Sequence, residues 1–280
     1  MARATFYYHL KRLDFDDGYD DLRNIIRTLF EKHHSRYGYR RITLELRNQG
    51  IVVNHKTVSK LMRQLHLKAL RTPRQFHTYK GNVGKIAPNT LNRNFRSNEP
   101  YKKWTTDVTQ IMIKEDRLYL SPILDMFNGE IITYTMTSRP DLKMVIDMVH
   151  NAIKKVPNHD GLILHSDQGW HYQHVKYQST LKKNGIEQSM SRKGNCLDNA
   201  MMENFFGIMK TELLYSRQWS CMEEFKRELK KYIHYYNYDR IKLRLHGMSP
   251  VQDRTHSIEK SITNRPTFGV QANIEGDLFM

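Results

Sequence analysis

Three acidic residues, far apart along the chain, have the type and setting for metal-dependent chemistry on phosphates. Asp107 lies in the middle of a strand-like run, where a carboxylate is disfavoured and costly if buried unpaired. Asp167 follows another apolar run, and Glu203 lies near the start of a predicted helix. Three carboxylates brought together would repel one another unless cations lay between them, and Mg²⁺ accepts such oxygen ligands. We therefore predict a site for two Mg²⁺ ions that cuts phosphodiester bonds.

The predicted helix around Glu203 begins at Asp198–Asn199, either of which could cap it. Its apolar stripe consists of Met202, Phe206, Met209 and Leu213. Helical spacing then puts Asn199, Glu203, Gly207 and Lys210 on one flank beside the buried face. Gly207 would let a DNA backbone approach, and Lys210 would meet a phosphate. Asn199 and Lys210 are therefore predicted to contact DNA.

The sequence from Tyr101 onwards is typical of an α/β domain with a mixed sheet. Strand-like runs cover 104–113, 118–124 and 130–137, the last two joined through the turn Asn128-Gly129. A helix at 141–155, a strand at 162–165, a helix near 174–183, a strand near 186–189 and the Glu203 helix follow. This order predicts an RNase H-like core at 98–255, a mixed five-stranded sheet with flanking helices. Residues 256–280 form a tail of unknown role.

Residues 1–70 are predicted to form a small all-α domain with a helix-turn-helix. One amphipathic helix covers 22–34, a second carries Ile42 and Leu46, and Asn54 caps a third. The third helix would expose Lys56, Thr57, Lys60 and Arg63, which are residue types that contact DNA in a major groove. The alternative is an ordinary solvated helix face.

The net charge of +16 favours a polyanionic partner, above all DNA. Between His55 and Lys103 there are 12 Lys or Arg residues and one acid, Glu99. The segment 71–97 therefore reads as a basic linker that follows phosphates without sequence choice, or as a merely soluble spacer. No apolar run approaches the roughly 18 residues of a membrane span, and we expect a cytoplasmic protein.

Several longer motifs surround the acidic residues. They are W-T-T-D-V-T, L-D-M-F-N-G-E-I, H-S-D-Q-G-W-H-Y, S-R-K-G-N-C-L-D-N-A-M-M-E-N-F-F, K-x-E and Y-I-H-Y-Y-N-Y-D-R. With 35 residues between Asp167 and Glu203, and Lys210 seven positions after Glu203, the pattern resembles the D, D-35-E pattern of retroviral integrases. The chain as a whole resembles the second reading-frame product of IS3-family insertion sequences.

The resemblance implies a DNA transposase in which water frees a 3′-hydroxyl at an element end, and that hydroxyl attacks another phosphodiester. It also implies Mn²⁺ as a substitute for Mg²⁺, a homo-oligomer on DNA, and a nucleoid-associated bacterial protein. A first reading-frame product, fused by frameshifting, is the expected partner. The sequence departs from the family where R-x-H-x-x-L is usual, since Arg240 is followed by different spacing up to His246.

Two other functions remain open at this stage. A DNA-binding regulator would keep the fold without chemistry, and a structure-selective nuclease would share the carboxylates without needing the helix-turn-helix. A serine hydrolase built on His165-Ser166-Asp167 is excluded, because neighbours on a strand point to opposite faces. His171 and Tyr172 are instead expected to border the DNA groove.

Overall fold

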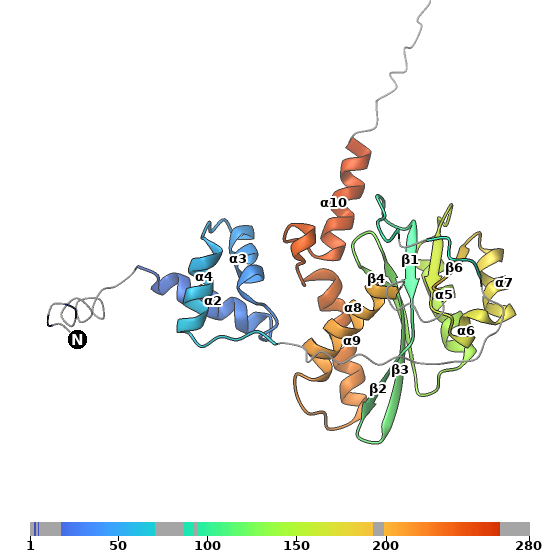
Figure 1. The fold of residues 1–280 in the computed structure, drawn as a ribbon, viewed down its shortest axis with the longest axis horizontal. Helices are drawn as coiled ribbons and strands as arrows, with labels where there is room; N and C mark the ends of the chain where they lie inside the picture. Colours follow the sequence, from blue (N-terminus) through green and yellow to red (C-terminus); the bar gives the residue numbers. More distant parts are fainter. Residues whose placement is uncertain are drawn as a thin grey trace, which may run out of the picture.

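The computed structural model describes residues 18–70, 87–91, 94–192 and 199–263, together with Arg3 and Thr5. A helical unit at 18–70 lies beside an α/β unit that includes the remaining described residues from 87 on (Figure 1). Asp198, a predicted helix cap, and residues 71–86 of the predicted linker lie outside the described residues. No helix in the described ranges is long and apolar enough to cross a membrane.

The helical unit consists of α2 (Asp20–Lys32), α3 (Tyr39–Asn48) and α4 (His55–Gln64). The predicted helical spacing is confirmed, because Ile26, Ile42 and Leu61 are buried in one shared core. Asn54 caps α4 as predicted, since its side chain accepts a hydrogen bond from the Lys56 amide at 2.9 Å.

The α/β unit is built on one mixed sheet, which contains six strands in the described residues. They are β1 (Lys103–Thr106), β2 (Thr109–Ile113), β3 (Asp116–Asp125), β4 (Ile131–Thr137), β5 (Ile163–Ser166) and β6 (Glu187–Met190). β3 pairs antiparallel with β1, β2 and β4, whereas β5 runs parallel to both β1 and β6. The prediction of an RNase H-like mixed sheet is confirmed, but the predicted number of five strands is wrong.

The difference arises at Asp107, where the predicted run 104–113 is interrupted. Thr106 pairs with Ile123 and Thr109 with Leu120, so one unchanged register puts Pro122 opposite Asp107. Proline has no N–H to donate to the ladder. The strand therefore breaks into β1 and β2, and Asp107 lies just past the end of β1 instead of inside a strand.

Helices cover both faces of the sheet (Figure 1). The helices and turns of this unit are α5 (Leu142–Lys155), α6 (Trp170–Gln173), α7 (Val175–Lys183), α8 (Ala200–Met209), the π-helical turn η2 (Lys210–Leu214), α9 (Met222–Tyr238), the 3₁₀ turn η3 (Leu243–Leu245) and α10 (Pro250–Thr263). Alternation along β3 divides the core, because Leu120 packs with α8 and α9 while Ile123 packs with α5 and α7. The domain boundary predicted at residue 255 falls inside α10.

Part of the predicted linker is not a spacer. Residues 87–91 lie along β6, where the Met190 amide donates to the Pro88 carbonyl at 3.3 Å and the Thr90 amide donates to Ser189 Oγ at 3.2 Å. Leu91 is buried. Apolar residues are not regularly spaced in this segment, so the sequence did not predict these contacts. The segment 87–91 therefore belongs to the α/β unit.

Candidate active site

The sheet brings Asp107 and Asp167 together. β1 and β5 are parallel neighbours, and Thr105 pairs with His165. Two residues further on, the same register puts Asp107 beside Asp167, each just past the end of its strand. Because neighbouring strands lie about 4.8 Å apart, the two carboxylates share the carboxyl edge of the sheet.

Backbone amides orient both carboxylates. The Val108 amide donates to Asp107 Oδ1 at 2.7 Å, and the Gly169 amide donates to Asp167 Oδ1 at 2.9 Å. A Cβ added to Gly169 would lie only 2.9 Å from the same Oδ1 atom. The glycine of H-S-D-Q-G therefore makes room for the carboxylate that its own amide holds.

Helix α8 presents Glu203 to this edge of the sheet. Asn199 anchors the start of α8, because its Oδ1 atom accepts a hydrogen bond from Thr105 Oγ1 on β1 at 2.9 Å. Met202 and Phe206 are buried as predicted, and Glu203 is exposed. Asn199 is only 7% exposed. It is therefore not on the open flank with Glu203, and the DNA contact expected of it stays a prediction.

The electrostatics show that four of the predicted residues interact. Burial, the charge of Asp167 and, more weakly, that of Glu203 raise the pKa of Asp107 to about 8. Burial also raises the pKa values of Asp167 and Glu203. Burial lowers the pKa of Lys210, and the charge of Asp107 opposes this shift. The edge therefore concentrates negative charge that one lysine only partly offsets.

This donor set fits divalent magnesium. In the ranges that the structure describes, no three His, Cys, Asp or Glu side chains converge on one point. The structure therefore puts Asp107 and Asp167 side by side but does not gather all three carboxylates into one metal-holding group. Mg²⁺ typically takes one or two carboxylates and completes its octahedron with water and substrate phosphate. The raised pKa of Asp107 also marks a carboxylate that a cation would return to its charged form.

His171 and Tyr172, which follow Asp167, do not border a DNA groove as predicted. Tyr172 and His171 are buried, and His171 Nε2 lies 3.0 Å from the Pro140 carbonyl oxygen, so neither borders an open groove. Trp170, which the prediction missed, is 55% exposed and stacks on His171 with ring centroids 3.9 Å apart. The sequence could have indicated Trp170, because this tryptophan follows Asp167 by three positions in the motif H-S-D-Q-G-W-H-Y.

No hydrolytic triad is present at Asp167. His165 Nδ1 lies 2.9 Å from Ser189 Oγ, on the neighbouring strand β6. The Ser166 hydroxyl donates instead to the backbone carbonyl of Asp167 at 3.0 Å. The exclusion of a serine hydrolase therefore agrees with the side-chain contacts.

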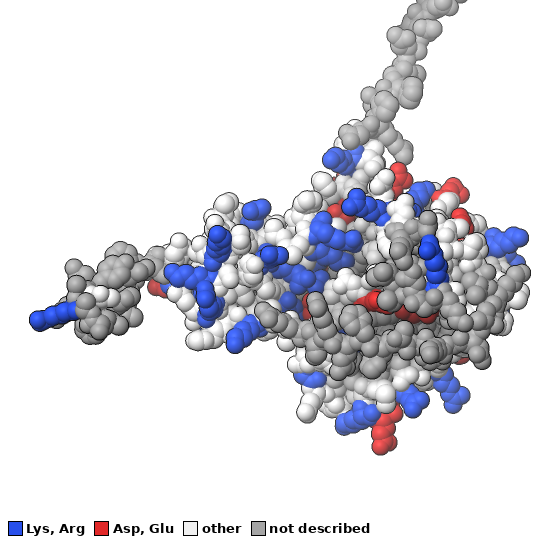
Figure 2. All heavy atoms as spheres, in the orientation of Figure 1, with Lys and Arg blue, Asp and Glu red and all other residues white. Residues whose placement is uncertain are grey.

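The predicted helix-turn-helix contacts lie on the helical unit, apart from the carboxylates. Lys56, Lys60 and Arg63 are exposed on α4, and Thr57 is half-buried. Figure 2 shows Lys and Arg side chains gathered over this unit. The structure therefore separates a basic helical surface from the acidic edge of the sheet.

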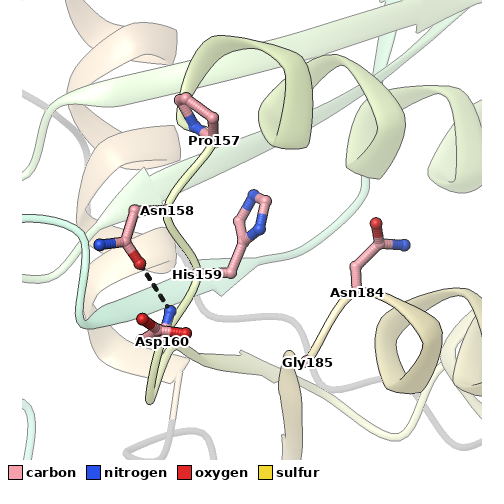
Figure 3. Close-up of a pocket in the computed structure, with 6 residues that line it drawn as sticks. All are labelled: Pro157, Asn158, His159, Asp160, Asn184 and Gly185. Atoms are coloured by element: carbon pink, nitrogen blue, oxygen red, sulfur yellow. Dashed lines mark hydrogen bonds between the residues drawn. The ribbon is translucent and has the colours of Figure 1, made fainter.

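An open pocket lies at the other end of β5 (Figure 3). Its lining residues are Pro157, Asn158, His159, Asp160, Asn184 and Gly185. Asp160 precedes β5, whereas Asp167 follows it, so the pocket is remote from the carboxylate edge. With a single carboxylate in its lining, this pocket has no comparable set of oxygen ligands.

Several motif residues outside the site join elements of the fold. The Asn128 side chain donates to the Pro250 carbonyl at 2.7 Å, Glu130 pairs with Arg254 at 2.6 Å, and Asn237 exchanges two hydrogen bonds with Ile131. L-D-M-F-N-G-E-I and the tyrosine-asparagine motif thus hold α9 and α10 on the β3–β4 turn. Their spacing predicted no such role, because the contacts span more than 100 residues.

Comparison with known proteins agrees with this architecture. Residues 97–196 and 203–258 each match a family model described as integrase core domain, and residues 19–76 match an HTH-like domain. The chain is 47% identical to the transposase InsK of insertion sequence element IS150 from Escherichia coli, over 92% of this chain and 91% of that protein. It is 31% identical to InsF of IS3A from the same species, over 82% and 80%.

Two further matches differ in extent. The transposase for IS1353 from Shigella flexneri is 39% identical over 91% of this chain, which spans only 50% of that longer protein. The HTLV-2 integrase catalytic core domain, solved in complex with magnesium, matches 57% of this chain and 99% of its own, at 19% identity and a TM-score of 0.47.

The integrase-core matches define a polynucleotidyl transferase of the retroviral-integrase type that acts in DNA transposition. Its relatives are transposases of bacterial insertion sequences, IS3 among them. The chain belongs to the IS3 family of insertion-sequence transposases.

Proposed function

We propose that Asp107, Asp167 and Glu203 are the catalytic metal ligands with which this transposase cuts and joins DNA. The observation that supports this best is the β1–β5 register, which puts Asp107 beside Asp167 at one sheet edge. Glu203 belongs to the same set because its charge acts on Asp107. Transposition needs a phosphodiester-cutting centre, and these residues supply oxygen ligands for one.

We infer two ions for the site. Two Mg²⁺ ions would activate the attacking oxygen and stabilise the leaving oxygen of an in-line displacement, with Mn²⁺ as a substitute. Asp107 interacts with both other carboxylates, so it is the ligand best suited to be shared. The Val108 and Gly169 amides hold the two aspartates in position before any ligand arrives. Lys210 would bind a DNA phosphate at the rim.

The test is incubation of the protein with labelled insertion-sequence ends and Mg²⁺, followed by separation of the products. Joined strands are expected from a transposase. Cut strands alone would indicate a nuclease, and bound but unaltered DNA would indicate a regulator. Either of the last two results contradicts the proposal if the protein is supplied together with its proposed partner.

Lys210→Ala should weaken engagement of the cleaved end more than Lys210→Arg does. The reason is charge, since arginine keeps the cation that faces the phosphate. End joining at physiological salt, compared across the two variants, measures the effect. Equal activity of Lys210→Ala and the unaltered protein would assign Lys210 to an ordinary solvated surface.

We also infer that this chain works with an upstream segment, the first reading-frame product, joined to it by frameshifting. The IS1353 transposase supports this, because its match to nearly all of this chain covers only half of the IS1353 protein. The upstream product would supply multimerisation and recognition of element ends. The complete enzyme would act as a homo-oligomer on DNA at the nucleoid, in the bacterial cytoplasm.

The unfused chain should accordingly bind cognate and unrelated DNA about equally at low salt. The excess of Lys and Arg neutralises phosphates without reading sequence, so the affinity should fall steeply as salt rises. Mobility shifts at increasing salt, with and without the fused upstream product, measure both properties. Selective binding and strand transfer by the unfused chain at physiological salt would contradict the two-frame proposal.

A further inference from the structure

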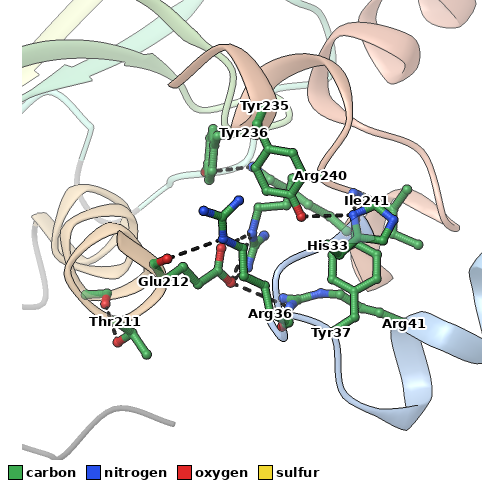
Figure 4. Close-up of polar contacts among 12 residues, drawn as sticks. His33, Arg36, Tyr37, Arg41, Thr211, Glu212, Tyr235, Tyr236, Arg240 and Ile241 are labelled. Carbon is green, nitrogen blue, oxygen red and sulfur yellow. Dashed lines mark hydrogen bonds and ion pairs between the residues drawn. The ribbon is translucent and has the colours of Figure 1, made fainter. Parts of the chain in front are cut away.

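The helical unit is docked on the α/β unit through a buried polar cluster (Figure 4). We name this cluster the Glu212 junction. Its members are Arg36, Tyr37, Arg41, Glu212, Tyr232 and Arg240. Three parts of the chain meet here: the helical unit, the turn η2 that follows α8, and helix α9 with the residues after it.

A buried ion pair forms the centre of the junction. Arg240 donates to both carboxylate oxygens of Glu212, with Nη2 2.7 Å from Oε1 and Nε 2.8 Å from Oε2. The Tyr232 hydroxyl donates to Oε2 at 3.0 Å. Burial lowers the pKa of Arg240, but the hydrogen bond and the charge of Glu212 together outweigh burial and raise that pKa. The pair therefore has its hydrogen bonds well satisfied within the α/β unit.

Two arginines of the helical unit make further contacts with Glu212, in addition to its ion pair with Arg240. Arg36 Nε donates to the Glu212 carbonyl at 3.3 Å, and its guanidinium lies 4.7 Å from the Tyr235 ring centroid. Arg41 Nη1 lies 3.7 Å from Glu212 Oε1. Burial and the like charge of Arg240 lower the pKa of Arg41, and the Glu212 carboxylate partly offsets this unfavourable setting. These two arginines therefore recognise Glu212 from outside its own unit.

Tyr37 fixes the same interface through its hydroxyl. This hydroxyl accepts a hydrogen bond from the Ile241 amide at 2.9 Å and donates one to the Asp239 carbonyl at 3.3 Å. Asn48, at the end of α3, donates to the Gly247 carbonyl at 2.9 Å. Because these contacts lie at both ends of α3, they fix the orientation of the helical unit on the α/β unit as well as the distance between the two units.

Glu212 also lies in the turn that directly follows α8, the helix that carries Glu203. It lies nine positions after Glu203, which is about 13 Å along a helix at 1.5 Å per residue. The turn η2 is π-helical, and the Thr211 hydroxyl donates back to the Gly207 carbonyl at 2.7 Å. Single π-helical turns within helices often occur at functional sites. Here the turn carries Glu212 towards the helical unit.

We infer that Glu212 is a positioning residue, which holds the helix-turn-helix unit at one distance and angle from Glu203. DNA bound along α4 would then reach the carboxylates at a fixed number of nucleotides from the contacted sequence. This inference rests on the proposed function for its catalytic meaning. The docking itself rests only on the contacts above.

The docking is tested by a distance measurement that needs neither DNA nor metal. Spin labels are attached at Lys60→Cys on α4 and Asn204→Cys on α8, both exposed, in a chain with Cys196→Ser and Cys221→Ser. A single narrow distance distribution is expected. Arg36→Ala with Arg41→Ala should at least double its width, while the Glu212–Arg240 pair remains intact.

Arg40→Ala is the matched control, because Arg40 neighbours Arg41 on α3 but is exposed and bonds only the Tyr39 hydroxyl in the described contacts. It should leave the distribution unchanged. A broad distribution in the reference chain would overturn the docking. A distribution that stays narrow in the double variant would overturn the role of the junction.

The positioning is tested by mapping the 3′ ends that the unlabelled, partner-fused proteins produce. The double variant should cut at several neighbouring positions with DNA affinity within about twofold of the reference, since phosphate contacts are unchanged. Arg40→Ala should cut at one position. A single cut position in the double variant, despite a broadened distance, overturns the positioning role. Absence of cutting in the reference would instead contradict the proposed function, and the two failures are thus distinguishable.

Discussion

Asp107→Asn, Asp167→Asn and Glu203→Gln should each lower DNA cleavage and joining by more than about 100-fold, because groups that only support a metal ligand already contribute about 10- to 100-fold. Each change keeps the size of the side chain and removes the charge that ligation needs. DNA binding should persist, since the basic helical unit is untouched. Product yields in Mg²⁺ and in Mn²⁺, with affinity measured in parallel, check this.

Asp147→Asn is the control for loss of an acid, because Asp147 lies on the exposed side of α5 and pairs only with Lys143 in the described contacts. Its cleavage activity should match that of the unaltered protein. Strand transfer retained by any one of the three site variants would remove that residue from the proposed metal site. Parallel loss of DNA binding would point to unfolding instead of chemistry.

Arg240→Met should destabilise the protein by about 3–5 kcal/mol, the usual cost of leaving one partner of a buried ion pair uncompensated. Glu212 is 6% exposed, so its charge would lack both water and its bidentate partner. Adding Glu212→Met should recover part of the loss, because an apolar pair of similar volume avoids the desolvation of two charges, although Arg41 loses its carboxylate partner. Denaturant unfolding of the single and double variants measures the difference.

Lys231→Met serves as the comparison, since its pair with Glu228 is on the exposed face of α9. Pairs of that kind contribute little to stability, and the unfolding midpoint should hardly move. If the double Met variant is as unstable as Arg240→Met alone, the uncompensated charge is not the cause. The hydrogen bonds that Arg240 itself makes would then account for the loss.

Local signals predicted much of this fold. Apolar spacing identified α2, α4 and α5, and the caps at Asn54 and Asp141 follow the preference of Asn and Asp for accepting amide hydrogen bonds. Charge and position also singled out Asp107 and Asp167, which the β1–β5 register puts side by side, while their role and that of Glu203 stay predictions. These features depend on neighbours within a few residues or on the residue type itself.

The features that escaped prediction depend on pairing across the chain. Pro122 interrupts the strand at Asp107 only because the β1–β3 register puts the two opposite each other. Glu212 is buried because Arg240, and the arginines of α3 and its preceding turn, reach it from elements far away in sequence. A sequence read locally shows a proline and a glutamate, and neither reveals its partner.

The strap of residues 87–91 has a consequence for assembly. An uncovered edge strand offers unpaired backbone groups to a strand from another chain. At β6 the Pro88 carbonyl already accepts a hydrogen bond from the Met190 amide, and the Leu91 amide donates to Ser189 Oγ at 3.4 Å. A second copy therefore cannot extend the sheet at Met190 without displacing the strap. If copies of this chain assemble, their contacts must lie on surfaces other than the backbone of Met190.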